Sequence, residues 1–226
     1  MPGFLLGFTG PAGSGKDTCG SFFIEKYGFK KLSFASTLKA MLATAGLPEP
    51  ATQALKEEIV PWLGVSWRHA AQTLGTEWGR TCIHPDLWIL TTLRNREIAL
   101  QQNPELGFVV TDVRFENEAR AIRDAGGWVV HLEGRKATLS GGTKQHASES
   151  GIVKRDCDFS LDNSVPLEHL RAKLVALHDF LFQPSQYKRW KCSNSKHAEE
   201  FEFNPGSVCP VCKSKGEMWR VGMVAR

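Results

Sequence analysis

Short apolar runs alternate with longer amphipathic stretches from residue 4 to residue 182 of the chain. The short runs predict strands at Phe4–Thr9, Lys31–Phe34, Phe108–Val113, Trp128–Gly134 and Asp158–Asn163. The longer stretches predict helices over Gly15–Tyr27, most of Ser36–Leu100, Glu116–Gly126 and Pro166–Phe182. This alternation is typical of an α/β fold with helices on both faces of a parallel sheet. We expect three layers around a central parallel sheet of five strands.

The composition changes near Pro184, beyond the last predicted helix. From Trp190 onward the chain is rich in turn residues and contains cysteines. We therefore predict a main domain over residues 1–183 and a small module over residues 184–226. Within the main domain, ligands should bind at the carboxyl ends of the parallel strands.

A glycine-rich loop joins the first predicted strand to the first predicted helix. Its sequence, from Gly10 to Lys16, fits the G-x-x-x-x-G-K pattern in the strand–loop–helix context that a phosphate-binding loop (P-loop) requires. Glycines let the backbone N–H groups point at phosphate oxygens, and the lysine reaches the β- and γ-phosphates of a nucleotide. A glycine-rich turn formed by chance is the alternative. The predicted phosphate ligands are Gly13, Ser14, Gly15, Lys16, Asp17 and Thr18.

Asp17 occupies the position where a serine or threonine usually follows the lysine. A carboxylate ~5 Å from a phosphate charge costs about 3 kcal/mol at an effective dielectric constant near 20. The cost falls if Mg²⁺ lies between them, so we predict that Asp17 faces the metal through a coordinated water. In the alternative, Asp17 only complements the positive end of the helix. Thr18 would offer its hydroxyl to the phosphates.

Several further motifs follow the loop. They are LSFASTLK (32–39), QTLGTEWGR (72–80), DLWI (86–89), TDVRFENEA (111–119), HASE (146–149) and LDN (161–163). With the phosphate loop, this ordered set resembles the phage-type deoxynucleoside monophosphate kinases over about residues 4–180. The resemblance implies ATP-dependent phosphorylation of deoxynucleoside monophosphates for DNA precursor synthesis, with Mg²⁺ as cofactor. It also implies that Asn163 contacts the adenine of the bound nucleotide. His146 and Glu149 belong to the HASE motif, which the family shares.

Phosphoryl transfer to a nucleoside monophosphate needs positively charged side chains that bind the acceptor phosphate. It also needs polar and aromatic side chains that bind the base. The helical region 36–100 supplies both residue types. Arginine suits phosphate, glutamine can read a base edge, and tryptophan can stack. We predict acceptor binding by Arg68, Gln72, Arg80 and Trp88, the first three at helical spacing. In the alternative, the arginines are solvated and Trp88 is a core residue, as we predict for Trp62, Trp67 and Trp78.

The strand at 108–113 ends in acidic and basic residues that should emerge at the ligand edge of the sheet. Asp112 is a second candidate for the Mg²⁺ water shell, or else it caps the next helix. We predict that Arg114 touches the acceptor phosphate and takes part in catalysis. The basic, glycine-rich region 135–155 is predicted to be a lid that excludes water, or in the alternative a solvated loop. Its site residues would be Arg135, which we count as catalytic, together with Lys144, His146 and Glu149.

The C-terminal module contains a Cys-Pro-x-Cys turn that resembles a zinc-ribbon knuckle. Two residues between thiolates suit tetrahedral Zn²⁺, so we predict a structural zinc ion bound by Cys192, His197, Cys209 and Cys212. The other three cysteines should be thiols, because an intracellular protein rarely forms disulfides, and we expect them to be buried and unreactive. They are Cys19, Cys82 and Cys157. Binding of nucleic acid through the module is left open.

Composition narrows the remaining function classes. The formal net charge of +4 on 226 residues is too small to argue for nucleic acid by itself. No apolar run is long enough to be a membrane span, so we expect a cytoplasmic protein, in the bacterial host if phage-encoded. A homodimer is left open. The two alternative functions are a small-metabolite kinase resembling dephospho-coenzyme A kinase and an ATP-responsive nucleic-acid-binding protein.

Overall fold

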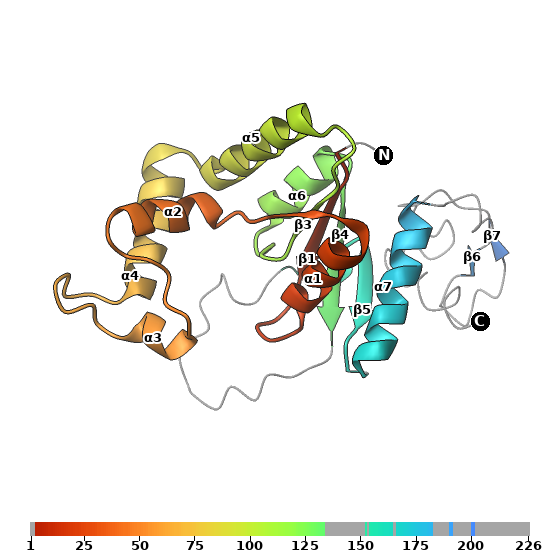
Figure 1. Ribbon diagram of the computed structural model, residues 1–226, viewed down its shortest axis with the longest axis horizontal. Helices are drawn as coiled ribbons and strands as arrows, with labels where there is room; N and C mark the ends of the chain where they lie inside the picture. The colour runs from red at the N-terminus through yellow and green to blue at the C-terminus, as the bar shows by residue number, and fades with distance from the viewer. Residues whose placement is uncertain are drawn as a thin grey trace. The chain divides into compact units, whose positions relative to one another are not determined.

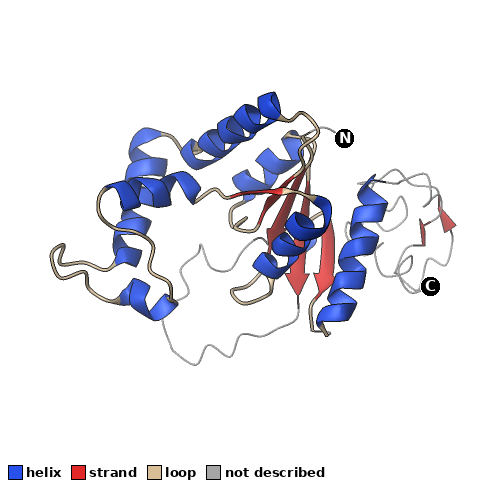
Figure 2. Cartoon of the chain, in the orientation of Figure 1, coloured by secondary structure: helices blue, strands red, loops and turns tan. Residues whose placement is uncertain are grey.

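The computed structural model describes residues 3–133, 152, 154–164 and 166–182, with the backbone of the short strands at 190–191 and 200–201. The chain divides into two compact units, one formed by residues 1–31 and 105 onward and the other by residues 32–104. The second unit nearly coincides with the predicted helical region 36–100. Figure 1 labels most of the helices and strands, and Figure 2 colours the chain by secondary structure.

The first unit is built on a five-stranded sheet. Its strands are β1 (Leu5–Thr9), β2 (Lys30–Leu32), β3 (Phe108–Val110), β4 (Trp128–Glu133) and β5 (Phe159–Asp162), in the order β2-β3-β1-β4-β5. Strand β1 pairs in parallel with β3 and β4, and β4 pairs in parallel with β5. The predicted α/β fold with a five-stranded parallel sheet is confirmed. The chain moves from one side of β1 to the other between β3 and β4, so the carboxyl end of β1 marks a ligand-binding position.

Helices cover both faces of this sheet (Figure 1). They are α1 (Lys16–Tyr27), α6 (Glu116–Asp124) and α7 (Leu167–Phe182), with a short 3-10 turn, η3 (Lys154–Asp156). Alternate residues of β1 face opposite ways. Leu6 and Phe8 join the core that α1 and α7 close, whereas a Cβ on Gly7 would lie 2.6 Å from Ile122 Cδ1 on α6. Gly7 therefore lets α6 approach the sheet closely.

The second unit is helical. Its elements are α2 (Ser36–Thr44), α3 (Gln53–Glu57), α4 (Trp67–Gln72), a π-helix η1 (Thr73–Ile83) and α5 (Leu87–Gln102). Breaks fall near Pro48 and Pro50, Pro61 and Pro85, as proline's missing N–H predicts. A cluster of its own, with Leu38, Leu42, Leu47, Trp67 and Trp88 at its centre, forms the core of this unit.

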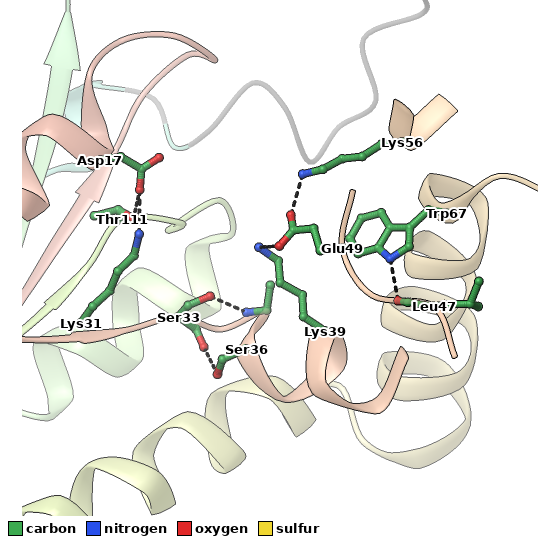
Figure 3. Close-up of polar contacts among 11 residues, drawn as sticks. Asp17, Lys31, Ser33, Ser36, Lys39, Leu47, Glu49, Lys56, Trp67 and Thr111 are labelled. Carbon is green, nitrogen blue, oxygen red and sulfur yellow. Dashed lines mark hydrogen bonds and ion pairs between the residues drawn. The ribbon is translucent and has the colours of Figure 1, made fainter. Parts of the chain in front are cut away.

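Of the residues predicted to be buried, Trp62, Trp78 and Cys82 are exposed. Trp67 is buried as predicted, and its Nε1 donates to Leu47 O at 3.0 Å (Figure 3). Trp62 and Trp78, however, are 65% and 40% exposed, so the prediction that they are core residues was wrong. Cys19 and Cys157 are buried free thiols as predicted, but Cys82 is an exposed one.

The last two strands, β6 (Trp190–Lys191) and β7 (Glu200–Phe201), form a separate antiparallel pair. They fall within the range predicted to be a zinc module. The four predicted zinc ligands lie outside the described residues. None of the described helices is long and apolar enough to cross a membrane.

Candidate active site

The loop after β1 has the backbone conformation that anion binding requires. Gly10, Gly13 and Gly15 have φ angles of 136°, 75° and 94°, a region that residues with a Cβ rarely adopt. Gly15 is the N-cap of α1, and no described side chain caps this helix. The first N–H groups of a twelve-residue helix therefore remain available to an anion, with the helix dipole favouring negative charge.

Lys16 lies over this loop. Its Nζ donates to Gly10 O at 2.8 Å and to Pro11 O at 2.7 Å. Burial lowers the pKa of Lys16, the neighbouring charge of Arg114 lowers it further, and Asp17 partly offsets both. The ammonium is thus held at the mouth of the loop, close enough to Arg114 for their charges to interact.

A hydrogen bond between the side chain of Asn163 and the backbone of Ser14 supports the phosphate loop. Asn163 follows β5 and is 4% exposed, and its Nδ2 donates to Ser14 O at 2.8 Å. Its backbone N–H donates to Glu133 O at 2.7 Å, which ties the loop to the end of β4. A Cβ on Gly15 would lie 2.4 Å from Asn163 Nδ2, so the glycine also permits this contact. The predicted nucleotide ligand Asn163 is therefore a structural support of the phosphate loop, whereas its contact with adenine stays a prediction.

Asp17 points from the first turn of α1 toward two residues of the sheet. Its Oδ1 accepts from Lys31 Nζ at 2.9 Å and from Thr111 Oγ1 at 2.7 Å (Figure 3). Partial burial raises the pKa of Asp17, but the hydrogen bonds from Lys31 and Thr111 outweigh it and the net shift is downward. The carboxylate is therefore ionised at neutral pH. Thr18, one residue later, is exposed.

Asp112 and Arg114 follow β3 at the same edge of the sheet. Asp112 is half-buried and Arg114 is exposed. Glu118 Oε2 accepts from the backbone N–H groups of Arg114 and Phe115 at 2.8 and 3.1 Å, and the two roles predicted for Asp112, in the Mg²⁺ water shell or as a cap of α6, stay predictions. Glu118 thus fixes the backbone from which Arg114 extends, a role that the sequence alone did not indicate.

These residues fit a Mg²⁺ ion held mainly by nucleotide and water. Asp17 and Asp112 offer carboxylate oxygens, which hard cations prefer, and Asp17 binds the sheet through only one of its two oxygens. Within the described residues there is no cluster of three or more metal-binding side chains. Two carboxylates suffice for a Mg²⁺ site, because this ion is usually bound by one or two carboxylates and completes its shell with phosphates and water.

A second contact at this edge involves Ile152. Its backbone N–H donates to Thr9 Oγ1 at 3.2 Å, and its carbonyl lies 3.2 Å from His131 Nδ1. Burial lowers the pKa of His131, which favours the neutral ring. Neither Thr9 nor His131 was predicted to belong to the site. The predicted lid residues lie outside the described residues, namely Arg135, Lys144, His146 and Glu149.

Four of the five predicted acceptor residues, all except Arg114, lie in the second unit. Arg68 forms an ion pair with Glu57 and donates to Gln53 Oε1 at 2.6 Å, so its guanidinium is engaged within the helices. Gln72 ends α4 and is half-buried. Arg80 lies on η1 and is half-buried, with Nη1 3.5 Å from Pro85 O. An eleven-residue π-helix is unusual, and π-helical turns are frequent at functional sites.

Trp88 is a core residue. It is 4% exposed, its Nε1 donates to Gly75 O at 2.7 Å, and its ring packs against Gly79. A buried ring has no face to offer a nucleobase, so the stacking role predicted for Trp88 was wrong. A tryptophan can either stack on a ligand at the surface or pack in a core, and the sequence alone did not show which of these Trp88 does.

Comparison with known proteins agrees with this geometry. The family model described as deoxynucleotide monophosphate kinase matches residues 51–174, more than half of the chain. The chain belongs to this family. It is 29% identical over 194 residues to the "Putative deoxynucleotide monophosphate kinase" of Acanthamoeba polyphaga mimivirus, covering 77% of this chain and 96% of that one. It is 28% identical over 169 residues to the deoxynucleoside-5'-monophosphate kinase of Escherichia phage T5, covering 70% of this chain and 64% of that enzyme.

Solved structures with a similar fold are more distant. Dephospho-CoA kinase from Campylobacter jejuni has 16% identity and a TM-score of 0.45, covering 82% of this chain and all of that one. The APS kinase CysC of Mycobacterium tuberculosis has 13% identity and a TM-score of 0.41, covering 79% of this chain and 98% of that one. The fold assignment therefore rests on the sheet order and phosphate loop described above.

Membership of the deoxynucleotide monophosphate kinase family confirms the predicted class of enzyme. The protein is a nucleotide kinase, a phosphotransferase, and the family implies ATP with Mg²⁺ and a deoxynucleotide as ligands. The alternatives of a dephospho-coenzyme A kinase and of an ATP-responsive nucleic-acid-binding protein are not favoured.

Proposed function

We propose that this protein transfers the γ-phosphoryl group of ATP to the phosphate of a deoxynucleoside monophosphate. An acceptor phosphate oxygen forms a bond to the γ-phosphorus, the bond to the β,γ-bridging oxygen breaks, and ADP leaves with the deoxynucleoside diphosphate. The observation that carries this proposal is an intact phosphate loop in a chain whose residues 51–174 match the deoxynucleotide monophosphate kinase family.

The residues of the first unit would supply positioning and positive charge, which is most of what phosphoryl transfer needs. The first N–H groups of α1 bind the β- and γ-phosphates, and Lys16 stabilises the charge that develops on the migrating group. Arg114, whose charge already acts on Lys16, approaches the acceptor phosphate. Asp17 and Asp112 would hold Mg²⁺ through its waters, and the ion would neutralise charge between the phosphates.

Acceptor binding by the second unit is a finer part of the proposal. Arg80 remains its best candidate for the acceptor phosphate, because it lies on the π-helix and Arg68 is engaged with Glu57. Gln72 would read the base. The roles of Arg135, Lys144, His146 and Glu149 and the cytoplasmic location stay predictions, while a homodimer and nucleic-acid binding stay open. So does structural Zn²⁺ on Cys192, His197, Cys209 and Cys212.

Measuring ADP release with a panel of acceptors tests the function. We expect turnover with at least one of the four common deoxynucleoside monophosphates and none with dephospho-coenzyme A. The Lys16→Ala variant should lose about 100- to 1000-fold in kcat, the usual effect of removing one preorganised charge-stabilising group. Lys26→Ala, in the last turn of the same helix, is the matched control. ADP release with dephospho-coenzyme A alone would refute the proposal.

A further inference from the structure

One oxygen of the Asp17 carboxylate carries both of its contacts to the sheet. Lys31 Nζ and Thr111 Oγ1 donate to the same Oδ1 at 2.9 and 2.7 Å (Figure 3). No described residue donates to Oδ2. The carboxylate is therefore fixed on one side and open on the other, at the start of the helix whose first N–H groups remain available to an anion.

The two donors come from neighbouring strands. Lys31 lies on β2 and Thr111 directly follows β3, and the two strands are adjacent in the sheet. Thr111 is buried, and a Cβ on Gly20 of α1 would lie only 2.5 Å from its Cγ2. Close packing against α1 holds the threonine hydroxyl in place, so the geometry around Oδ1 is built into the fold.

This arrangement bears on how an anion enters the loop. Asp17 is adjacent to Lys16 in the chain, and a bare carboxylate there would repel the phosphates of a nucleotide. Lys31 adds a second positive charge at 2.9 Å from the carboxylate, on a side chain that contacts no part of the loop backbone in the described structure.

We propose that Lys31 is a positioning residue that compensates the charge of Asp17, so that the loop accepts a nucleotide's phosphates even without a divalent cation. Thr111 holds the same oxygen and keeps Oδ2 turned away from the sheet. This inference rests on the proposed function only in requiring that the loop bind nucleotide phosphates. It explains why a carboxylate is tolerated directly behind the loop lysine.

A double-mutant cycle on ADP binding tests it, measured by titration calorimetry in EDTA and again in saturating Mg²⁺. In EDTA, Lys31→Met should weaken ADP binding about fivefold, equivalent to about 1 kcal/mol, which is the upper end for an exposed ion pair. In the Asp17→Asn background the same change should weaken binding by less than about 1.5-fold. In saturating Mg²⁺, Lys31→Met in the wild-type background should weaken ADP binding by less than about twofold.

Lys30→Met is the matched control, because it removes the same charge from the adjacent position of β2, which faces the other side of the sheet. It should leave ADP affinity unchanged in EDTA. Thr111→Val, nearly the same size, should retain the charge compensation of Lys31 and shift ADP affinity less than Lys31→Met does.

Two results would overturn the inference. An equal loss in both Asp17 backgrounds would mean that Lys31 contacts the phosphates directly, and no loss in either would mean that the ion pair is irrelevant to binding. Because ADP binding is measured without turnover, a protein that binds ADP but phosphorylates no deoxynucleoside monophosphate would refute the proposed function and leave this inference standing.

Discussion

Asn163 shows how a single buried amide can support a functional loop. Its Nδ2 supplies a hydrogen bond to the carbonyl of Ser14, which is itself buried beneath the loop. A buried carbonyl that loses its donor costs about 1–3 kcal/mol, because it no longer has water as an alternative partner. The effect of Asn163 on the loop should therefore be present in the absence of nucleotide.

We expect Asn163→Ala to lower the free energy of unfolding by about 1–3 kcal/mol in nucleotide-free protein and to raise the KM for ATP more than the KM for the acceptor. Urea unfolding and steady-state kinetics measure the two effects. Ser164→Ala, at the exposed neighbouring position, should change stability by less than about 0.5 kcal/mol. Unchanged stability with a raised KM for ATP would instead assign Asn163 to adenine contact alone.

The described cysteines differ in reactivity for a physical reason. Burial raises the pKa of both Cys19 and Cys157 to about 12, so at pH 8 these thiols are almost wholly protonated and also inaccessible. Cys82 is exposed. We expect iodoacetamide at pH 8 to label Cys82 in the folded protein and to spare Cys19 and Cys157 until urea is added, as peptide mass mapping would show. Labelling of Cys19 at the rate of Cys82 would contradict the packing of α1 against the sheet.

At the scale of elements, the π-helix η1 depends on its contact with Trp88. A Cβ on Gly79 would lie 2.4 Å from Trp88 Cζ2 and 2.9 Å from its Nε1. The ring is buried and its Nε1 is bonded to Gly75 O, so it cannot yield easily. The glycine thus sets how closely η1 approaches α5, and with it the position of Arg80, the next residue.

We expect Gly79→Ala to lower the free energy of unfolding by up to about 2 kcal/mol, because overpacking costs about 1–3 kcal/mol and the helical preference of alanine offsets roughly 1 kcal/mol of it. The KM for the acceptor should rise as Arg80 shifts. Gly75→Ala is the control, since its Cβ would meet only Leu38 Cδ1, the end of a flexible side chain, at 2.9 Å. Equal urea midpoints for the two variants would show that Trp88 does not constrain η1.

The elements were largely predictable, whereas the geometry of η1 was not. Apolar runs placed every strand of the main sheet within about three residues of its observed bounds, and the signal is strongest for β1 and β3, which are buried along their whole length. Positions four residues apart, such as 72, 76 and 80, lie near one another in both α- and π-helices. The sequence spacing therefore predicted a helix but could not distinguish a π-helix, and it could not show that Trp88 packs beneath it.

At the scale of the whole molecule, contacts between distant residues limited the prediction of the site. Lys16 and the loop glycines form a local motif, so they could be identified from spacing alone. The contact of Asp17 with Thr111 joins residues 94 positions apart, and that of Asn163 with Ser14 joins residues 149 positions apart. Both depend on which strands become neighbours, which is a property of the sheet order rather than of any segment.

The predicted boundary near Pro184 leads to a prediction about the whole chain. Helix α7 belongs to the core of the first unit, since the ring of Phe182, its last residue, lies 4.6 Å from that of Phe4 and 6.0 Å from that of Phe29. We expect a chain ending at Gln183 to keep its unfolding midpoint and its kcat for phosphoryl transfer, because every described residue that touches the phosphate loop is retained.

The full-length chain should bind about one zinc ion by atomic absorption and the shortened chain none, if the predicted ligands are correct. A chain ending at Asp179 is the matched control. It removes Phe180, Leu181 and Phe182, three residues packed into or against the core, and it should be destabilised by several kcal/mol, since truncating each large buried apolar side chain costs about 2–5 kcal/mol. Loss of kcat in the chain ending at Gln183, with its unfolding midpoint unchanged, would mean that the C-terminal module takes part in the reaction. Zinc retained by the shortened chain would place the metal in the main domain and remove the reason for assigning it to the cysteines beyond residue 190.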